Sequence, residues 1–292
     1  MTILPTAILT ADWHLRDSVP VCRIDDFWQT QWRKVEFVAK LALKYNCPVL
    51  HAGDLFDNWK PSPYLLSMAL MYLPDNFYTV YGNHDLPQHS LKEREKSGIH
   101  TLEKAGKIHV LPNGHWGEEL DPTVILFENN PSFEKIAVWH KFTYGSVLPW
   151  PGCKEVSAFS LLRKNPYFRL IVTGDNHTPC VVRLKDRVLV NPGSLMRQTA
   201  DQLDHTPRVY LWYSNTNEIK KVMVPIDVSA VIRTHLDDVA KKDERIQAFI
   251  SKLQEKWDVT LSFEENMKTF LFTHRLKKQV VELIHAAMDH TE

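Results

Sequence analysis

Short apolar runs, each ending in a cluster of polar residues, recur along the N-terminal part of the chain. They lie in ILPTAILTADWH, CPVLHAGDLFDN, NFYTVYGNHD, KIAVWHK and LIVTGDNH. Apolar runs of about four to eight residues bounded by turn residues are typical of buried strands. We therefore predict five strands whose carboxyl ends carry the polar clusters, which is where α/β folds place chemistry. RVLVNPGS, RVYLWYS and EIKKVMVPI predict three further strands, with a turn at 214–217.

Two segments between these runs have a helical period instead. Asp25 or Asp26 can cap a helix that ends near Asn46 and whose apolar residues share one face. A second helix is predicted over 61–73, with Leu65 and Ala69 on its apolar side. We interpret both apolar faces as core packing.

The pattern changes after residue 226. Apolar residues keep a helical period from Val228 to Leu253, and Ser262 with Glu265 forms a capping-box signature. That signature predicts a second helix through Met267, Phe270, Leu271, Leu283 and Ile284. The sequence therefore predicts a mixed α/β domain at 1–226 and a helical C-terminal region at 227–292.

Composition and charge narrow the class of protein. Of 292 residues, 44% are hydrophobic, and 35 Lys and Arg balance 35 Asp and Glu. This neutrality excludes a strongly basic nucleic-acid coat but leaves a local basic patch open. No stretch of about 18 apolar residues occurs and the N-terminal segment lacks a basic leader, so we expect neither a membrane span nor a secretory signal. Four scattered cysteines without a CxxC pair favour reduced thiols in a cytoplasmic protein.

Residues of metal-ligand type follow the five predicted strands. In chain order they are Asp12, His14, Asp54, Asn83, His84, Asp85, His140, Asp175 and His177. Residues i and i+2 of a strand point to one side, so D-x-H at 12–14 and D-x-H at 175–177 can each aim two ligands at one ion. The set suits two divalent ions about 3.5–4 Å apart, with Asp54 as the bridging carboxylate. Mixed carboxylate, imidazole and amide ligands fit manganese, iron, magnesium or zinc.

The ordered blocks D-x-H, G-D-x-x-D, G-N-H-D, an isolated His and G-x-x-H resemble the calcineurin-like metallophosphoesterase superfamily. Within it, DWHL, HAGDLFDNWKPSP and VYGNHD are similar to the SbcD-type DNA double-strand-break repair nucleases of bacteria and phages. The resemblance covers about residues 4–195. It implies a four-layer αββα sandwich, to which this chain would add a small C-terminal helical tail.

The resemblance also implies a role for each ligand-type residue. The first metal would be held by Asp12, His14 and His177, the second by Asn83 and His140, with Asp54 between them. His84 is similar to the catalytic histidine, which protonates or stabilises the leaving oxygen, and Asp85 would orient its ring. A water acidified by the two ions would attack phosphorus in line. Manganese is the expected metal, with magnesium, iron or zinc as alternatives.

Two positions depart from the nuclease pattern. Asp175 stands where the family usually has the first histidine of His-x-His, and we expect its carboxylate to bind the second metal. The alternative is that Asp175 only orients a neighbour. Arg16 and Asp17 stand where a glycine usually follows DWHL. Asp57 is expected to fix a loop or a ligand, and isolated histidines such as His51 are interpreted as structural.

These features predict a manganese-dependent DNA nuclease of repair or recombination, acting as an exonuclease and as a single-strand endonuclease. A phosphatase, or a small-molecule or nucleotide phosphodiesterase, of the same superfamily is the alternative, which the zero net charge favours. A local basic track could still come from Lys92, Arg94, Lys96, Arg163, Lys164 and Arg169. A non-catalytic scaffold is disfavoured because every expected ligand position holds a competent residue.

The resemblance implies partners besides DNA. An SMC-like coiled-coil ATPase would bind the helices of 228–288, although packing of those helices on the catalytic domain is an equal alternative. A homodimer is also implied, for which residues 64–73 would supply a face.

Overall fold

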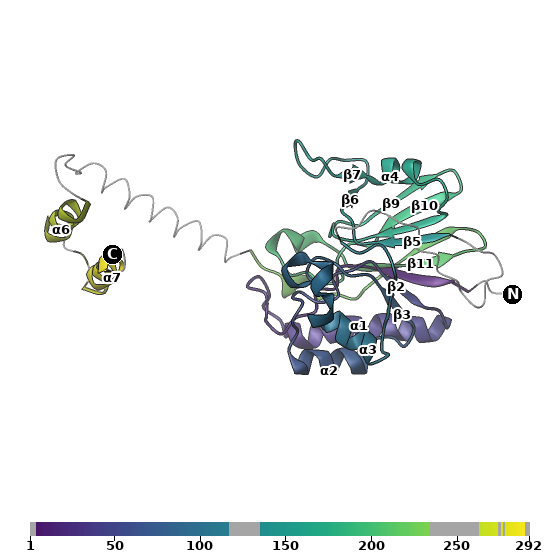
Figure 1. Ribbon diagram of the computed structural model, residues 1–292, viewed down its shortest axis with the longest axis horizontal. Coiled ribbons are helices and arrows are strands. Elements are labelled where there is room, and N and C mark those ends of the chain that lie inside the picture. Colours follow the sequence, from purple (N-terminus) through teal and green to yellow (C-terminus); the bar gives the residue numbers. More distant parts are fainter. Residues whose placement is uncertain (1–3, 117–134, 234–262, 274–275, 277, 290–292) are drawn as a thin grey trace. The chain divides into compact units, whose positions relative to one another are not determined.

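A computed structural model describes residues 4–116, 135–233, 263–273, 276 and 278–289 (Figure 1). The chain divides into two compact units, residues 1–232 and 233–292. The first unit holds all of the predicted site residues, and each unit is described by itself below.

Two β-sheets form the centre of the first unit. One has six strands in the order β12-β11-β1-β2-β3-β4, and the other has four in the order β5-β8-β10-β9. Strands β1 to β4 run parallel, as do β5, β8 and β10, whereas β9, β11 and β12 pair antiparallel with their neighbours. The first sheet comprises β1 (Ala7–Thr10), β2 (Val49–His51), β3 (Phe77–Thr79), β4 (His109–Val110), β11 (Arg208–Tyr213) and β12 (Glu218–Met223). The second comprises β5 (Ile136–Trp139), β8 (Leu170–Thr173), β9 (Cys180–Leu184) and β10 (Arg187–Asn191).

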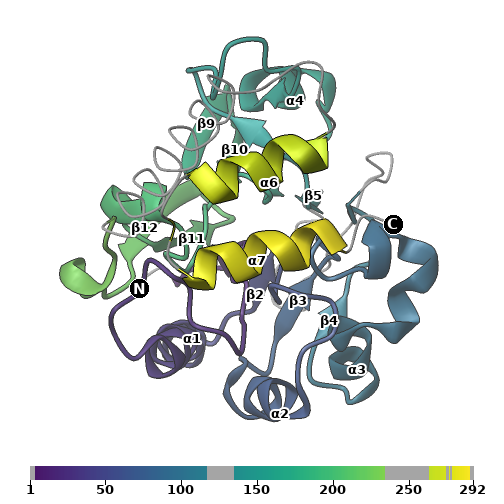
Figure 2. The ribbon, with the colours of Figure 1, turned by 90° about the vertical axis from the view of Figure 1, so that its left-hand side faces the viewer.

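Apolar side chains from both sheets fill the space between them, among them Leu9 and Leu50 from one sheet and Val138 and Val172 from the other. The opposite face of the six-stranded sheet packs against α1 (Phe27–Tyr45), α2 (Pro63–Tyr72) and α3 (Gly98–Lys104). Helix α4 (Ala158–Lys164) covers the outer face of the four-stranded sheet. Figure 2 shows α1, α2 and α3 together on one side and α4 on the other. The predicted four-layer αββα sandwich is confirmed.

Local signals account for the helix ends that the sequence predicted. The Asp26 carboxylate accepts the N–H of Gln29 at the start of α1, and Asn46 closes that helix in the left-handed conformation, with φ 47° and ψ 51°. Ser62 caps α2 in the same way by accepting the N–H of Leu65. Capping of this kind satisfies N–H groups that have no partner within the helix. The predicted strands and the turn at 214–217 are also present.

The helix predicted from Val228 is wrong at its start. Val228–Ala230 forms one 3-10 turn, and Val231 pairs with Arg23 in an isolated antiparallel bridge. Backbone hydrogen bonds from Ile24 to Ala230 and from Ile232 to Cys22 hold this segment extended, so tertiary pairing overrides its apolar period. Ser262 and the rest of the predicted helix lie outside the described residues. That part of the prediction rested on Leu236, Val239, Ile246, Phe249, Ile250 and Leu253.

The second unit contains two described helices where one was predicted. They are α6 (Phe263–Thr273) and α7 (Lys278–Asp289). The residues that predicted a single helix include none between Leu271 and Leu283, and the interruption falls within that gap. No described helix is long and apolar enough to cross a membrane.

Candidate metal centre

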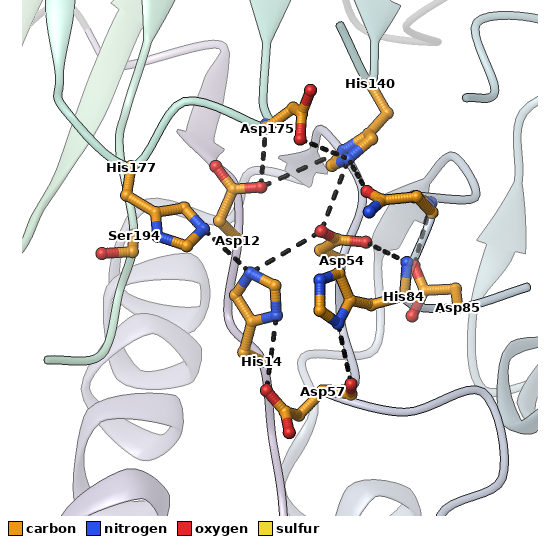
Figure 3. Close-up of polar contacts among 12 residues, drawn as sticks. Asp12, His14, Asp54, Asp57, His84, Asp85, His140, Asp175, His177 and Ser194 are labelled. Atoms are coloured by element: carbon orange, nitrogen blue, oxygen red, sulfur yellow. Dashed lines mark hydrogen bonds and ion pairs between the residues drawn. The ribbon is translucent and has the colours of Figure 1, made fainter. Parts of the chain in front are cut away.

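The predicted site residues converge where the carboxyl ends of strands from both sheets meet (Figure 3). They come from the loops after β1, β2, β3, β5 and β8. The loops after β1 and β2 stay hydrogen-bonded side by side, because Asp12 N–H donates to the Gly53 carbonyl and His14 N–H to the Asp54 carbonyl, both at 3.0 Å. This backbone pairing brings the first two motifs together although about forty residues separate them.

One group of potential ligands consists of Asp12, His14 and His177, whose ligand atoms lie within 4.8 Å of one another. The Nε2 atoms of the two imidazoles are 3.1 Å apart. The Oδ2 atom of Asp12 is buried without a hydrogen-bond partner, which is costly for a carboxylate unless a cation binds it. Burial also lowers the pKa of His14 well below its usual value, which favours the neutral imidazole that metals bind. This group therefore fits a divalent cation.

The Oδ2 atom of Asp54 lies between two imidazoles. It is 3.6 Å from His14 Nε2 and 3.4 Å from His140 Nε2. The other carboxylate oxygen, Oδ1, accepts the backbone N–H of His84 at 2.9 Å, so the carboxylate is held in place. Burial raises the pKa values of Asp12 and Asp54 well above those of free carboxyls, and the negative charges of neighbouring aspartates add to the rise. Asp54 thus occupies the position that a carboxylate bridging two cations requires.

The second group centres on His140. Its Nδ1 atom lies 2.8 Å from the Ala52 carbonyl and therefore carries the proton, which leaves Nε2 free to act as a ligand. That Nε2 atom is 3.0 Å from Asn83 Oδ1 and 3.9 Å from Asp175 Oδ1. The Asp175 backbone N–H donates to Asp12 Oδ1 at 3.0 Å, which ties the two groups together. The carboxylate of Asp175 thus faces the same imidazole as Asn83.

The prediction that Asp85 orients the His84 ring is wrong. The buried Asp85 carboxylate instead accepts backbone N–H groups of Leu55, Phe56 and Gly82 at 3.0–3.3 Å, because its side chain turns inward beneath the loop. His84 Nδ1 donates to the Asp57 carbonyl at 2.8 Å. Asp85 therefore shapes the loops, and the second aspartate of GDLFD orients His84 through its main chain. Because a main-chain carbonyl makes this contact, the residue type at position 57 could not have predicted it.

Four of the ligand-type residues have left-handed backbone conformations, at φ 50° for Asp12, 45° for His14, 57° for Asp54 and 70° for Asp175. Such conformations cost roughly 1–3 kcal/mol each in residues other than glycine, and they cluster at functional sites. The first strand ends at Thr10, so Asp12 and His14 lie beyond it. The prediction that strand geometry points Asp12 and His14 to one side is therefore wrong. The left-handed backbone of the loop orients the two side chains instead.

The basic residues that could form a local track lie on separate elements. Lys92, Arg94 and Lys96 belong to the 3-10 helix Leu91–Lys96, which packs beside α3. Arg163 and Lys164 end α4, in the opposite outer layer. The two groups therefore lie on different sides of the sandwich. His51 is a core residue as predicted, with Nδ1 2.8 Å from Thr79 Oγ1.

The chain belongs to the calcineurin-like phosphoesterase family, whose model matches residues 6–237. Membership of this family makes the chain a phosphoester hydrolase. The family uses a dinuclear divalent metal site, and this chain has candidate aspartate and histidine ligands for one. No sequence match was found among curated proteins.

Similar solved structures include an archaeal phosphodiesterase, 15% identical, with a TM-score of 0.43 over 74% of this chain and 98% of that chain. A protein of Thermus thermophilus, TT1561, is 12% identical, with a TM-score of 0.45 over 76% of this chain and 100% of that chain. Vacuolar protein sorting 29 from Cryptosporidium parvum is 16% identical, with a TM-score of 0.38 over 76% of this chain and 97% of that chain.

Proposed function

We propose that the chain is a metal-dependent DNA nuclease of repair or recombination that hydrolyses phosphodiester bonds with two divalent ions, manganese foremost. The observation that carries the two-metal part is the position of Asp54 Oδ2, 3.6 Å from His14 Nε2 and 3.4 Å from His140 Nε2. Resemblance of DWHL, HAGDLFDNWKPSP and VYGNHD to repair nucleases supports DNA as the substrate.

In this proposal the protein supplies ligands, orientation and a proton. Two bound ions would neutralise phosphate charge and acidify the attacking water. Asp54 would be a ligand of both ions. The other ligands of the first ion would be Asp12, His14 and His177, and those of the second Asn83, His140 and Asp175. The Asp57 carbonyl accepts the Nδ1 proton of His84 and so directs Nε2 toward the reaction. As a general acid, His84 would carry a second proton on Nε2, pass it to the leaving oxygen and return to the neutral imidazole with its proton on Nδ1.

Exposed aromatic and apolar side chains in a segment that is anchored to the metal centre support a nucleic-acid substrate. They lie in the segment after His140 that contains β6 (Thr143–Tyr144) and β7 (Val156–Ser157). Trp150 is 49% exposed and contacts the Phe142 ring edge to face at 5.4 Å between centroids. Asn176, from the loop of Asp175 and His177, donates to the Thr143 carbonyl at 2.6 Å and so anchors the segment to the centre. Exposed rings of this kind stack with bases of single strands.

Two partners belong to the proposal. An SMC-like coiled-coil ATPase would bind the second unit through α6 and α7, and a second copy of the chain would pack against α2. Tyr64 and Met71 on α2 are 61% and 69% exposed, which leaves apolar surface for such a dimer. Sedimentation of the full chain and of Met71→Asp tests the dimer, which the charged variant should dissociate.

A phosphatase or small-molecule phosphodiesterase is the second candidate. Zero net charge and the separation of the basic residues onto different layers favour it, because DNA affinity rests on Lys and Arg contacts to phosphate.

Activity on four substrates separates the two candidates: linear duplex DNA, single-stranded DNA, a phosphodiester reporter and a phosphomonoester reporter, each with manganese. We expect DNA cleavage that His84→Ala reduces by about 100-fold or more, the size of a lost general acid. Hydrolysis of the monoester without cleavage of DNA would overturn the nuclease proposal. Full activity of the His84 variant would remove its assigned role.

A further inference from the structure

Arg16, one of the residues that depart from the nuclease pattern, lies beside the metal centre. Its NH1 group is 3.2 Å from Asp57 Oδ2. Asp57 in turn accepts His84 Nδ1 through its carbonyl and places Oδ1 3.9 Å from His14 Nδ1. Within the described part of the chain, Arg16 is the only lysine or arginine that forms an ion pair with a carboxylate of this centre. Asp57 therefore contacts both the Arg16 guanidinium and the His84 ring.

The main chain and one end of the guanidinium are held rigidly. The fully buried Gln31 accepts the Arg16 N–H at 3.2 Å and donates to the Arg16 carbonyl at 2.9 Å. NH1 lies 3.4 Å from Gln198 Oε1, and Gln198 donates its own Nε2 to the His14 carbonyl at 2.7 Å. These contacts fix the guanidinium relative to the loop that carries His14. A cation held in this way loses little conformational freedom when it binds a ligand.

The other edge of the guanidinium has only a neutral partner. Both Nε and NH2 donate to the hydroxyl of the exposed Ser18, at 3.0 and 2.8 Å. These two parallel donors match the paired oxygens of a phosphate, and such charge-assisted pairs are stronger than a bond to a hydroxyl. The side chain is 27% exposed, so this edge is accessible.

We propose that Arg16 binds a second phosphate of the substrate, the one next to the scissile phosphate in a nucleic-acid strand. Arg16 thereby favours a polynucleotide over a substrate that has a single phosphate. This inference rests on the proposed nuclease function and names the residue that reads the continuing strand.

The test compares thymidine oligonucleotides that differ by one phosphate. The kcat and KM of the manganese-loaded full chain are measured on a dinucleotide with one phosphodiester and on a trinucleotide with two. Arg16→Ala should raise KM for the trinucleotide at least about tenfold more than KM for the dinucleotide, the value of one charge-assisted pair. Arg16→Lys should recover part of the difference. Arg33→Ala, which removes an exposed guanidinium on α1, serves as the control and should change neither value.

Salt dependence provides a readout that a purely structural role would not alter. Each phosphate contact to a single strand contributes a slope of about 0.7 in the logarithm of affinity against the logarithm of salt concentration. Arg16→Ala should reduce the slope for a longer oligonucleotide by about that amount. Equal losses on both short substrates with an unchanged slope would show that Arg16 only positions Asp57, and would overturn the inference. If the unaltered protein hydrolyses a reporter but no oligonucleotide, the nuclease proposal fails and the inference with it.

Discussion

Gly82 approaches Asp54 so closely that a Cβ atom on Gly82 would lie 2.0 Å from Asp54 Oδ1. The glycine of GNHD therefore makes room for the carboxylate that lies between His14 and His140. Gly53, the glycine of GDLFD, likewise faces His140, with its hypothetical Cβ 2.4 Å from Nδ1. The glycines of these motifs thus mark places where one loop touches the ligands of another.

Gly82→Ala should displace the Asp54 carboxylate and weaken metal binding by about tenfold or more, since overpacking a rigid site costs about 1–3 kcal/mol. Isothermal titration with manganese measures the effect. Gly145→Ala is the matched control, because its added Cβ meets only ordinary contact, at 3.5 Å from Cys180 Cβ. Two manganese ions bound to Gly82→Ala with unaltered affinity would contradict a shared role for Asp54.

Asp175→Ala should lower manganese occupancy from two ions toward one. Its carboxylate faces the His140 imidazole at 3.9 Å, and its removal leaves Asn83 and His140 as the remaining unshared ligands of that group. Metal counting by mass spectrometry after gel filtration measures the occupancy. Asp75→Ala is the control, because the Asp75 side chain is 97% exposed and belongs to none of the loops that carry the ligands. Unchanged two-ion occupancy would mean that Asp175 only orients its neighbours.

Manganese should stabilise the folded chain. The unpartnered Asp12 Oδ2 gains a ligand on binding, and binding to the native state alone adds about 2.7 kcal/mol at a metal concentration of 100 times Kd. Differential scanning fluorimetry should therefore show a higher Tm with manganese than with a chelator. Asp12→Asn should shrink this shift. A shift of the same size in the variant would argue that the ion binds elsewhere.

Trp150→Ala should weaken binding of single-stranded DNA. Loss of base stacking costs about 1–3 kcal/mol per base, so Kd should rise about fivefold or more. Fluorescence anisotropy with a labelled oligonucleotide, in a chelator so that metal-dependent cleavage is prevented, provides the measurement. Tyr167→Ala removes another exposed ring, 76% accessible, and should leave Kd unchanged. Equal effects of the two variants would indicate that exposed rings contribute without regard to position.

Buried Lys34 should make stability depend on pH. Burial, followed by the charges of Arg23 and Arg197, lowers the pKa of Lys34 from 10.5 to about 7. Between these pH values the unfolded chain binds one more proton than the folded chain, so the free energy of unfolding rises with pH. The rise from this group should be about 2 kcal/mol between pH 7 and pH 9.

Urea unfolding of Lys34→Met at the two pH values isolates that contribution, because the variant should lack the rise. The Lys34 ammonium also donates to the Leu195 carbonyl at 2.9 Å, so the variant is compared with itself across pH rather than with the unaltered chain at one pH. Lys40→Met lies on the same helix at a 76% exposed side chain and should keep the full dependence. The same slope in Lys34→Met would contradict the assignment.

Short-range sequence patterns were enough to predict the strands, the ends of α1 and the residues that come together at the metal centre. Each depends on neighbours in the chain: an apolar run for β5, the Asp26 and Asn46 caps for α1, and a polar cluster after each strand. Parallel strands within each sheet then place those clusters at one edge.

The contacts within the centre were decided only by tertiary structure. Asp85 is next to His84 in sequence, yet Asp57 orients that ring. Val228 carries a helical period, yet its segment pairs with residues 22–24. Arg16 finds Asp57 and Gln198, residues that no pattern links to it. Hydrogen-bond direction depends on where separate loops meet, and the strained backbone of Asp12 and His14 is stable only because surrounding layers hold it.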